Sequence, residues 1–367
     1  MAPIGVAQVV HSLEVGGMER VASHLALAAS PEFKHTVICL TVKGHFAPEL
    51  EAAGIEVVAL NKQPGKDLGL PRRLAQVFRE REIKVMHAHN SGPLFTGTIA
   101  ARLAGVPCKV VTDHSRKFPE RTTVVAAEWV LSRLLDAIVS VSEDNKVDLL
   151  EKLHWPPAKI SVIPNGVAEV PTVNDEQAAA LRAELGLSAE VPTVLTVARL
   201  EKQKHLSVLI EAARLLRERG AAAKFLIAGE GSDRPALEKQ IAENNLGDAV
   251  SLLGWRLDSP MLYRIADLFA LSSDWEGLPM SLLEAMSARL PVALTDVGDV
   301  GKAVVPAQTG LLVPSNAPGE LADALAALIG DAQQRRAYGE AGYARWRELF
   351  SVERMVERYE KLYARFL

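Results

Sequence analysis

The stretch Glu276-Gly-Leu-Pro-Met-Ser-Leu-Leu-Glu284-Ala-Met-Ser sets two carboxylates around seven residues, where a loop is expected to become a helix. Pro279 suits a first helical turn, because the amide hydrogen it lacks has no partner there, and Met280 to Arg289 read as helix. Free amides at such a helix start favour an anion such as a diphosphate, whereas carboxylates favour hydroxyls. The string therefore predicts a site with one acid on a ribose and one on a hexose. The competing interpretation is a solvated acidic pair beside a core helix.

Outward from this string, short β-branched runs alternate with helical runs along the chain. This alternation predicts an α/β protein with parallel, doubly wound sheets. The predicted strands are Ile4–Val10, Thr36–Leu40, Lys84–His87, Lys109–Thr112, Ala137–Val141, Thr193–Ala198, Lys224–Ala228, Leu268–Leu271 and Pro291–Thr295.

A turn- and proline-rich stretch at 165–175 interrupts the alternation, which then restarts. We therefore expect two domains, residues 1–168 and 169–349, and a C-terminal helix over 350–367 that packs back on the first domain. Open parallel sheets bind ligands at the carboxyl ends of their strands, so the two domains are expected to face a shared cleft.

Composition argues for a soluble globular protein and against several other classes. The 367 residues are 49% hydrophobic and 23% charged, with a formal net charge of −4, too balanced for a nucleic-acid binder. Cys39 and Cys108 form neither a disulfide framework nor a metal pattern, which fits a reducing cytoplasm. The start of the chain reads as a buried strand, not a signal peptide, and no run reaches the length of a membrane span. Any membrane contact is therefore expected to be peripheral.

Two cations follow the first predicted strand of the second domain. In Val197-Ala-Arg199-Leu-Glu-Lys-Gln-Lys204-His, the arginine ends the strand and the lysine begins the next helix. Fixed positive charges there can neutralise a diphosphate as it leaves, which is where electrostatic stabilisation lowers a barrier most.

A glycine pair, Gly16 and Gly17, joins the first strand to the first helix. Glycines at that junction let backbone amides approach a ligand closely. The pair is not a G-x-G-x-x-G fingerprint, and Gly229-Glu-Gly231 lacks the third glycine as well, so a nicotinamide site is poorly supported.

Together, the glycine pair, Arg199 with Lys204, the turn Leu253-Gly-Trp-Arg256, the E-x7-E string and Thr309-Gly-Leu-Leu-Val-Pro314 resemble family 4 of the glycosyltransferases, which has the two-domain GT-B fold. The resemblance spans essentially the whole chain. It implies a retaining transferase that moves a sugar from a nucleoside-diphosphate sugar to a hydroxyl of a glycan, a lipid-linked acceptor or a small molecule. Cell-surface polysaccharide or glycolipid synthesis is the implied setting.

The resemblance also implies residue roles. Arg199 and Lys204 would hold the donor diphosphate, Glu284 the ribose and Glu276 the transferred sugar. The remaining implied donor contacts, mostly through backbone, are Gly16 and Gly17 at the phosphates, Gly254, Trp255 and Arg256 at the nucleobase, and Met280, Ser281 and Leu282 at the phosphates and sugar. No cofactor and no bound metal are implied, and a UDP-sugar is favoured over a GDP-sugar.

Histidines concentrate in the first half of the chain. His114 follows a strand where the family commonly keeps a histidine near the donor sugar and acceptor, so we predict that it is catalytic. His87 and His89 share one strand face at a spacing that could suggest zinc, but no third ligand is evident and we reject a metal there.

The sequence leaves the donor sugar, the reaction class and membrane contact open. Gly277-Leu-Pro replaces the commoner Gly-Phe-Gly, and Thr295-Asp-Val-Gly-Asp-Val-Gly301 lacks a usual proline, so the donor sugar is not fixed. A GT-B sugar-nucleotide epimerase and a non-catalytic scaffold are the other functional readings. Basic residues near the apolar run Val124–Leu135 could dock on anionic lipid at the inner face of the membrane, or could simply be a solvated helix face.

Overall fold

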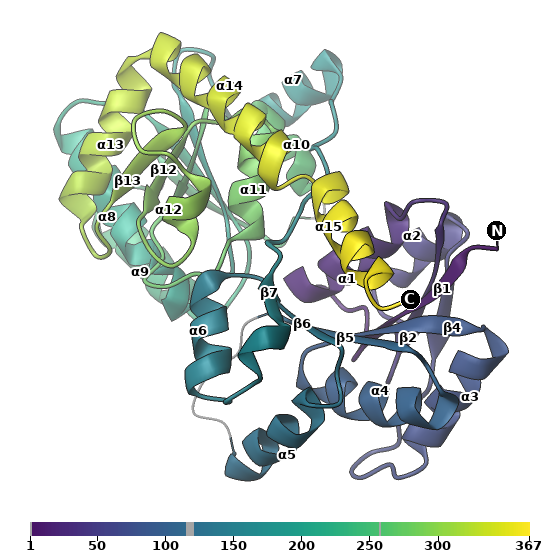
Figure 1. Ribbon diagram of the computed structural model, residues 1–367. Helices are drawn as coiled ribbons and strands as arrows, with labels where there is room; N and C mark the ends of the chain where they lie inside the picture. The colour runs from purple at the N-terminus through teal and green to yellow at the C-terminus, as the bar shows by residue number, and fades with distance from the viewer. Residues whose placement is uncertain (1, 115–120, 257) are drawn as a thin grey trace. The chain divides into compact units, whose positions relative to one another are not determined.

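The computed structural model of the protein describes residues 2–114, 121–256 and 258–367 (Figure 1). The chain divides into two compact units. Unit 1 comprises Met1–Val167 together with Val352–Leu367, and unit 2 comprises Ala168–Ser351. Each unit has its own parallel sheet and its own core, so each is described by itself.

Unit 1 is built on a seven-stranded sheet in the order β3-β2-β1-β4-β5-β6-β7, and every pairing is parallel. The central strands are nearly continuous apolar runs, as expected where helices cover both faces of a sheet. The strands are β1 (Ile4–Val10), β2 (Phe33–Cys39), β3 (Glu56–Ala59), β4 (Ile83–His89), β5 (Cys108–Asp113), β6 (Ala137–Ser140) and β7 (Ile160–Val162).

Helices cover both faces of this sheet, with α1, α2 and α15 on one side and α3, α4 and α5 on the other (Figure 1). The C-terminal helix α15 packs against α1, so the last segment of the chain completes unit 1. The helices are α1 (Gly17–Leu27), α2 (Ala47–Ala52), α3 (Leu70–Glu80), α4 (Ser91–Ala104), α5 (Thr122–Ser132), α6 (Glu143–Glu151) and α15 (Val352–Ala364).

Unit 2 repeats the architecture with six parallel strands in the order β10-β9-β8-β11-β12-β13. The strands are β8 (Thr193–Val197), β9 (Lys224–Ala228), β10 (Val250–Gly254), β11 (Leu268–Leu271), β12 (Val292–Thr295) and β13 (Gly310–Val313). The helices are α7 (Asp175–Glu184), α8 (Leu206–Glu218), α9 (Arg234–Glu243), α10 (Ser259–Ile265), α11 (Met280–Ser287), α12 (Val300–Ala303), α13 (Pro318–Gly330) and α14 (Ala332–Leu349). Helix α8 packs against α9 and α13, while α11 packs against α14.

The strands that the predicted alternation leaves out are the four outermost ones, β3, β7, β10 and β13. They contain few fully buried positions, whereas β11 and β12 are buried throughout. An edge strand packs less of its surface, so its sequence carries a weaker apolar signal than a central strand.

The two parallel sheets determine where the loops that carry the predicted site residues lie. In a parallel sheet all strands end at the same edge, so the loops that follow them gather there.

Among the described residues no helix combines the length and apolar character needed to cross a bilayer.

Candidate active site

The predicted donor residues of unit 2 lie after the carboxyl ends of its strands. Arg199 follows β8, Gly254 ends β10, and Glu276 lies in the loop between β11 and α11. Strands β8 and β11 are neighbours in the sheet, which brings the arginine-lysine segment beside the first acid of the E-x7-E string.

Lys204 and Glu276 are in direct contact. Lys204 lies in the short 3-10 helix Lys202–Lys204 ahead of α8, and its Nζ forms an ion pair with Oε1 of Glu276. The two side chains are only 13% and 6% exposed, so the pair is shielded from water. The Ser273 hydroxyl donates to the same carboxylate oxygen at 2.6 Å. Sequence reasoning gave this lysine and this acid separate ligands, whereas the structure makes them partners.

Arg199 is an exposed residue with a looser attachment. Its Nη2 reaches Oε1 of Gln203 at 3.5 Å, and Gln203 in turn donates to the Trp275 carbonyl at 2.9 Å and lies 3.5 Å from Oε2 of Glu276. Arg199 and Glu276 are therefore joined through one glutamine. An exposed guanidinium on a flexible stem can move onto an anion at small cost.

Glu284 lies inside α11, and its carboxylate is held by a tyrosine. The Tyr263 hydroxyl, from α10, donates to Oε2 of Glu284 at 2.7 Å. Burial, and then the adjacent Glu284 carboxylate, raises the pKa of Tyr263 well above its usual value, so the phenol keeps its hydrogen and remains a donor. Sequence reasoning missed Tyr263 because nothing in Met-Leu-Tyr-Arg marks it as different from a core aromatic residue.

Helix α11 begins at Met280 with Pro279 as its N-cap and no side-chain cap. The Leu282 amide donates to the Pro279 carbonyl at 3.2 Å, and the Tyr263 hydroxyl reaches the Ser281 carbonyl at 3.4 Å. The predicted amides Met280 to Leu282 therefore lie in the first turn of α11, where the Leu282 amide is already bonded to Pro279.

The turn after β10 is shaped by backbone conformation. Gly254 has φ +74°, a left-handed value that a side chain disfavours, and its carbonyl accepts from the Gly229 amide at 2.8 Å. Trp255 is 53% exposed. The Arg256 guanidinium is already paired with Asp258 at 2.6 Å and Glu184 at 3.3 Å, so the Trp255 side chain and the backbone are what this turn has available for a ligand.

A second loop supports Glu276 from behind. At Gly298, with φ +55°, a Cβ would lie 1.9 Å from the Glu276 carbonyl oxygen, so only glycine fits. Asp299 donates its amide to the Gly277 carbonyl at 3.1 Å. The glycine in Thr295-Asp-Val-Gly-Asp-Val-Gly301 thus positions the first acid through its backbone.

The other predicted residues lie in unit 1. Gly16 is the N-cap of α1 and Gly17 its first residue; a Cβ on Gly16 would lie 2.2 Å from Oε2 of Glu19. The carboxylate of Glu19 therefore folds toward the start of α1. Burial raises the pKa of Glu19.

His114 follows β5 and is linked through Asn90 to Met18 at the start of α1. Its amide donates to Oδ1 of Asn90 at 2.8 Å, and Nδ2 of Asn90 lies 3.3 Å from Sδ of Met18, next to Gly17. Burial lowers the pKa of His114 to about 4, so its imidazole is neutral near pH 7. His87 and His89 are fully buried, and their ring nitrogens form hydrogen bonds with other protein groups.

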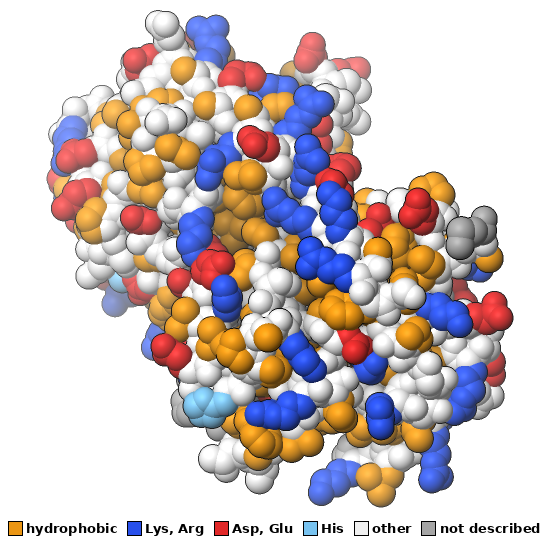
Figure 2. Space-filling model, viewed as in Figure 1, with side chains coloured by type: hydrophobic (Ala, Val, Ile, Leu, Met, Phe, Trp, Pro, Cys, Tyr) orange, Lys and Arg blue, Asp and Glu red, His pale blue; other side chains and the backbone are white. Residues whose placement is uncertain are grey.

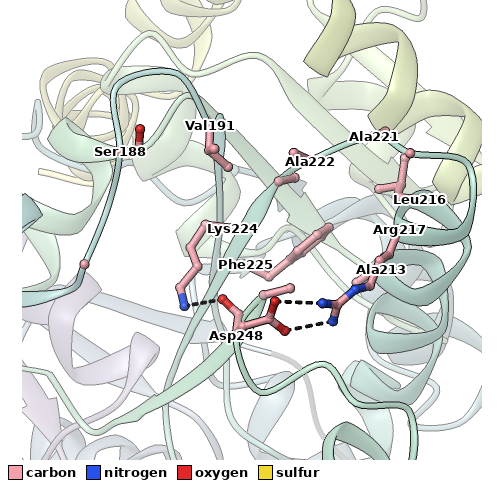
Figure 3. Close-up of a pocket in the computed structure, with 14 residues that line it drawn as sticks. Ser188, Val191, Ala213, Leu216, Arg217, Ala221, Ala222, Lys224, Phe225 and Asp248 are labelled. Carbon is pink, nitrogen blue, oxygen red and sulfur yellow. Dashed lines mark hydrogen bonds and ion pairs between the residues drawn. The ribbon is translucent and has the colours of Figure 1, made fainter.

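A cavity of about 400 Å³ in unit 2 lies away from these residues (Figure 3). It is lined by the segments that precede β8 and β9, at the amino ends of the strands, and by several alanines and glycines. Its charged side chains are already paired, since Arg217 binds Asp248 at 2.7 Å and Lys224 binds the Asp248 carbonyl at 2.8 Å. In the ranges that the structure covers, no group of three or more His, Cys, Asp or Glu side chains is arranged to hold a metal ion.

Comparison with known proteins identifies the class. Residues 15–169 match the sequence model described as Glycosyltransferase Family 4, and residues 177–345 match Glycosyl transferases group 1. Alpha-D-kanosaminyltransferase of Streptomyces kanamyceticus is 30% identical over 293 residues, 75% of each chain. UDP-Gal:alpha-D-GlcNAc-diphosphoundecaprenol alpha-1,3-galactosyltransferase of Escherichia coli is 28% identical over 334 residues, 86% of each chain.

Solved structures show the same fold. A glycosyltransferase from Rickettsia africae superposes with a TM-score of 0.88 at 19% identity, covering 100% of this chain and 99% of the other. Anabaena HepE in complex with UDP-glucose superposes with a TM-score of 0.85 at 22% identity, covering 99% and 100%. The fold and the strand-end residues define a glycosyltransferase of the GT-B type, a class that uses nucleotide sugars. The chain belongs to glycosyltransferase family 4.

Proposed function

We propose that this protein is a retaining glycosyltransferase that takes its sugar from a UDP-sugar without a bound metal. The observation that supports it most is the contact cluster at the carboxyl edge of the second sheet. Lys204, Glu276, Ser273 and Gln203 are joined there, with Arg199 at the margin. Such a cluster offers cations for a diphosphate and carboxylate oxygens for sugar hydroxyls.

The donor is expected to bind unit 2 in a fixed order along this edge. The turn Gly254 to Arg256 meets the base, Glu284 the ribose, and the first amides of α11 with Arg199 and Lys204 the diphosphate. Glu276 accepts from hydroxyls of the transferred sugar, and its bond to Lys204 keeps that lysine extended toward the same place. The predicted contact of Gly16 and Gly17 in unit 1 with the phosphates stays a prediction.

For the chemical step, the bond between the anomeric carbon and the diphosphate oxygen breaks while the acceptor oxygen bonds to that carbon from the same face. The proton of the acceptor hydroxyl passes to the departing diphosphate, so no protein nucleophile is required. Arg199 and Lys204 stabilise the charge that develops on the leaving group, and exclusion of water limits hydrolysis. His114 contacts a substrate hydroxyl in this scheme.

A donor screen tests the proposal. Release of nucleoside diphosphate is measured for UDP-, GDP- and ADP-sugars with lipid-linked and free acceptors, and the anomeric configuration of the product is read by NMR. We expect turnover with a UDP-hexose, product of retained configuration, and no loss of rate in EDTA. Inverted product would refute retention, and rate loss in EDTA that Mg²⁺ restores would refute metal-independent transfer.

The same assay separates the other functional readings. An epimerase would convert the UDP-sugar with no acceptor present, and a scaffold would bind no nucleotide in calorimetry. We expect no epimerisation, because the relatives that match most of the chain are named transferases. We expect nucleotide binding, because the Lys204–Glu276 pair and the Tyr263–Glu284 bond hold charged groups in the segments that follow β8 and β11.

A lipid-linked acceptor at the cytoplasmic face of a membrane is supported by one surface of unit 1 and by the printed substrate of the Escherichia coli relative. Exposed apolar side chains lie on α4, on α5 and just after it, and these two helices pack together. They are Ile99, Leu103, Trp129, Val130 and Leu134, which we term the α4–α5 patch.

The exposed charged side chains within α4 and α5 and at the two ends of α5 are arginines. Arg102, Arg121 and Arg133 are exposed, and the Arg133 guanidinium lies 3.4 Å over the Trp129 ring. The only acid within α4 and α5, Glu128, is buried. Hydrophobic side chains and Lys or Arg side chains lie side by side over this part of unit 1 (Figure 2). This combination favours the interface of an anionic bilayer.

Vesicle flotation tests the surface with a matched control. Trp129→Ser with Val130→Ser should lose salt-sensitive retention on vesicles of anionic phospholipid. Val147→Ser on α6, where a similarly exposed valine lies between Lys146 and Asp148, should retain it. Absence of flotation by the parent protein would remove the membrane from the proposal and leave the transfer reaction standing.

A further inference from the structure

Beneath His114 lies a buried chain of hydrogen bonds that the reaction scheme does not use. His114 Nε2 lies 2.9 Å from Nδ1 of His89, and Nε2 of His89 lies 2.8 Å from Oε1 of Gln8. The His89 and His114 rings stack with centroids 5.1 Å apart. Gln8 and His89 are fully buried on the neighbouring central strands β1 and β4, so they form a rigid support.

The chain of bonds has a direction, because the Gln8 carbonyl oxygen can only accept. His89 must therefore carry its hydrogen on Nε2. Burial, together with His87 and His114 nearby, lowers the pKa of His89 well below its usual value, so the ring is neutral and its Nδ1 is an acceptor. His114 then donates from Nε2, and its own Nδ1 carries a lone pair.

The contacts at the other end of Gln8 are compatible with this direction. Its Nε2 faces Nδ1 of His35 at 3.3 Å and the Tyr363 hydroxyl at 3.5 Å. The Tyr363 hydroxyl can accept there while it donates to Nδ1 of His87 at 2.7 Å. Rotation of the Gln8 amide by half a turn would reverse every hydrogen along the path and place one on Nδ1 of His114.

Nδ1 of His114 is the free end of the path. It is buried and has no hydrogen-bond partner among the described residues. A buried acceptor of this kind is one that a ligand can satisfy, and the ligand group must supply a hydrogen.

We propose that Gln8 and His89 are positioning residues that hold His114 in the tautomer protonated on Nε2, so that Nδ1 accepts a hydrogen bond from a substrate hydroxyl. The inference rests on the proposed transferase function for the identity of that substrate. The hydrogen-bond assignment itself is a property of the free protein. A sugar or acceptor that lacks this hydroxyl would leave Nδ1 of His114 without a hydrogen-bond partner. Gln8 and His89 would therefore help to determine which substrate is accepted.

The first measurement needs no substrate. NMR of the isotope-labelled imidazole nitrogens near neutral pH, with His114→Asn to assign the resonances, should show a protonated Nε2 and an unprotonated Nδ1 on His114. In Gln8→Met, which keeps the shape but removes the carbonyl acceptor, the His114 tautomer should become mixed. A hydrogen on Nδ1 in the parent protein would overturn the inference.

The second measurement tests whether His89 affects turnover through His114. His89→Leu should lower kcat about ten-fold with little change in donor KM, since it removes one hydrogen bond that orients a substrate contact. His89→Asn, whose amide oxygen can stand where Nδ1 stood, should recover most of that loss. In a His114→Ala background, His89→Leu should have almost no further effect. Equal ten-fold losses in both backgrounds would show that His89 acts by packing alone.

His24 supplies the control, because it is a histidine of unit 1 whose burial lowers its pKa to about 4 but whose Nδ1 faces the Gly166 carbonyl instead of the path from Gln8 to His114. His24→Leu should leave the His114 tautomer unchanged. A parent protein with the expected tautomer but no turnover on any donor would refute the proposed function and support the assignment. A reversed tautomer with turnover intact would refute this inference alone.

Discussion

The Lys204–Glu276 ion pair gives the sharpest test of the site. In Lys204→Met the side chain keeps its approximate length and loses its charge, which leaves the Glu276 carboxylate 6% exposed without its cation. Removing one partner of a buried pair costs about 3–5 kcal/mol, and the lower end applies because Ser273 and Gln203 still face the carboxylate. For a unit that spans Ala168–Ser351, about 3 kcal/mol corresponds to a fall in Tm of roughly 6–12 °C.

The double variant Lys204→Met with Glu276→Gln separates stability from transfer. Neutral side chains leave no buried charge, so the double variant should be at least as stable as either single variant. Sugar transfer should fall at least about ten-fold in all three, since both groups are proposed to contact the donor. The assays are thermal unfolding and nucleoside-diphosphate release. Stability losses of the two single variants that simply add in the double variant would show that the pair does not interact in solution, and unchanged turnover would refute its role.

Three further outcomes are expected. Tyr263→Phe removes the donor to Glu284 at 2.7 Å and should raise donor KM about three- to ten-fold with kcat nearly unchanged; a change in kcat alone would contradict a ribose role for that acid. Gly298→Ala forces a Cβ to 1.9 Å from the Glu276 carbonyl oxygen, so it should lower the free energy of unfolding by about 2 kcal/mol or more and remove most of the transfer activity. Gly319→Ala, whose Cβ would meet nothing within 4 Å, should change neither. Burial lowers the pKa of His35 to about 4, so the unfolded chain binds a proton there more readily than the folded chain does. The free energy of unfolding of unit 1 should therefore fall by up to about 3 kcal/mol as pH falls from about 6.5 to about 4. Calorimetry of His35→Leu should show a shallower dependence of stability on pH, and an equal slope would refute this.

The location of the predicted site residues relative to the strands could be derived from sequence where a residue type and a chain junction coincide. Arg199, Lys204 and Glu276 follow strands that the apolar pattern locates, and parallel strands end at one edge, so their gathering follows from the pattern alone. The roles assigned to these residues stay predictions.

The partners of those residues could not be predicted in the same way. Tyr263 lies 21 residues from Glu284, and Ser273 has no feature that separates it from any loop serine. Their contacts depend on how α10 and the loop after β11 pack, and packing is set by many side chains at once instead of by a local pattern. The histidine spacing in β4 raised the question of a metal, whereas the structure satisfies both imidazoles with hydrogen bonds.

The sequence by itself determined the class of fold, because buried central strands require continuous apolar runs and crossover helices require a 3.6-residue period, and both can be read locally. It also determined which charged residues stand at strand ends. Tertiary structure alone decided that Lys204 and Glu276 are partners and that Glu284 is held by a phenol. It alone decided that Tyr363, 355 residues from Gln8 along the chain, lies beside it under His114. Hydrogen bonds act over about 3 Å and depend on direction, so only the folded chain settles which groups they join.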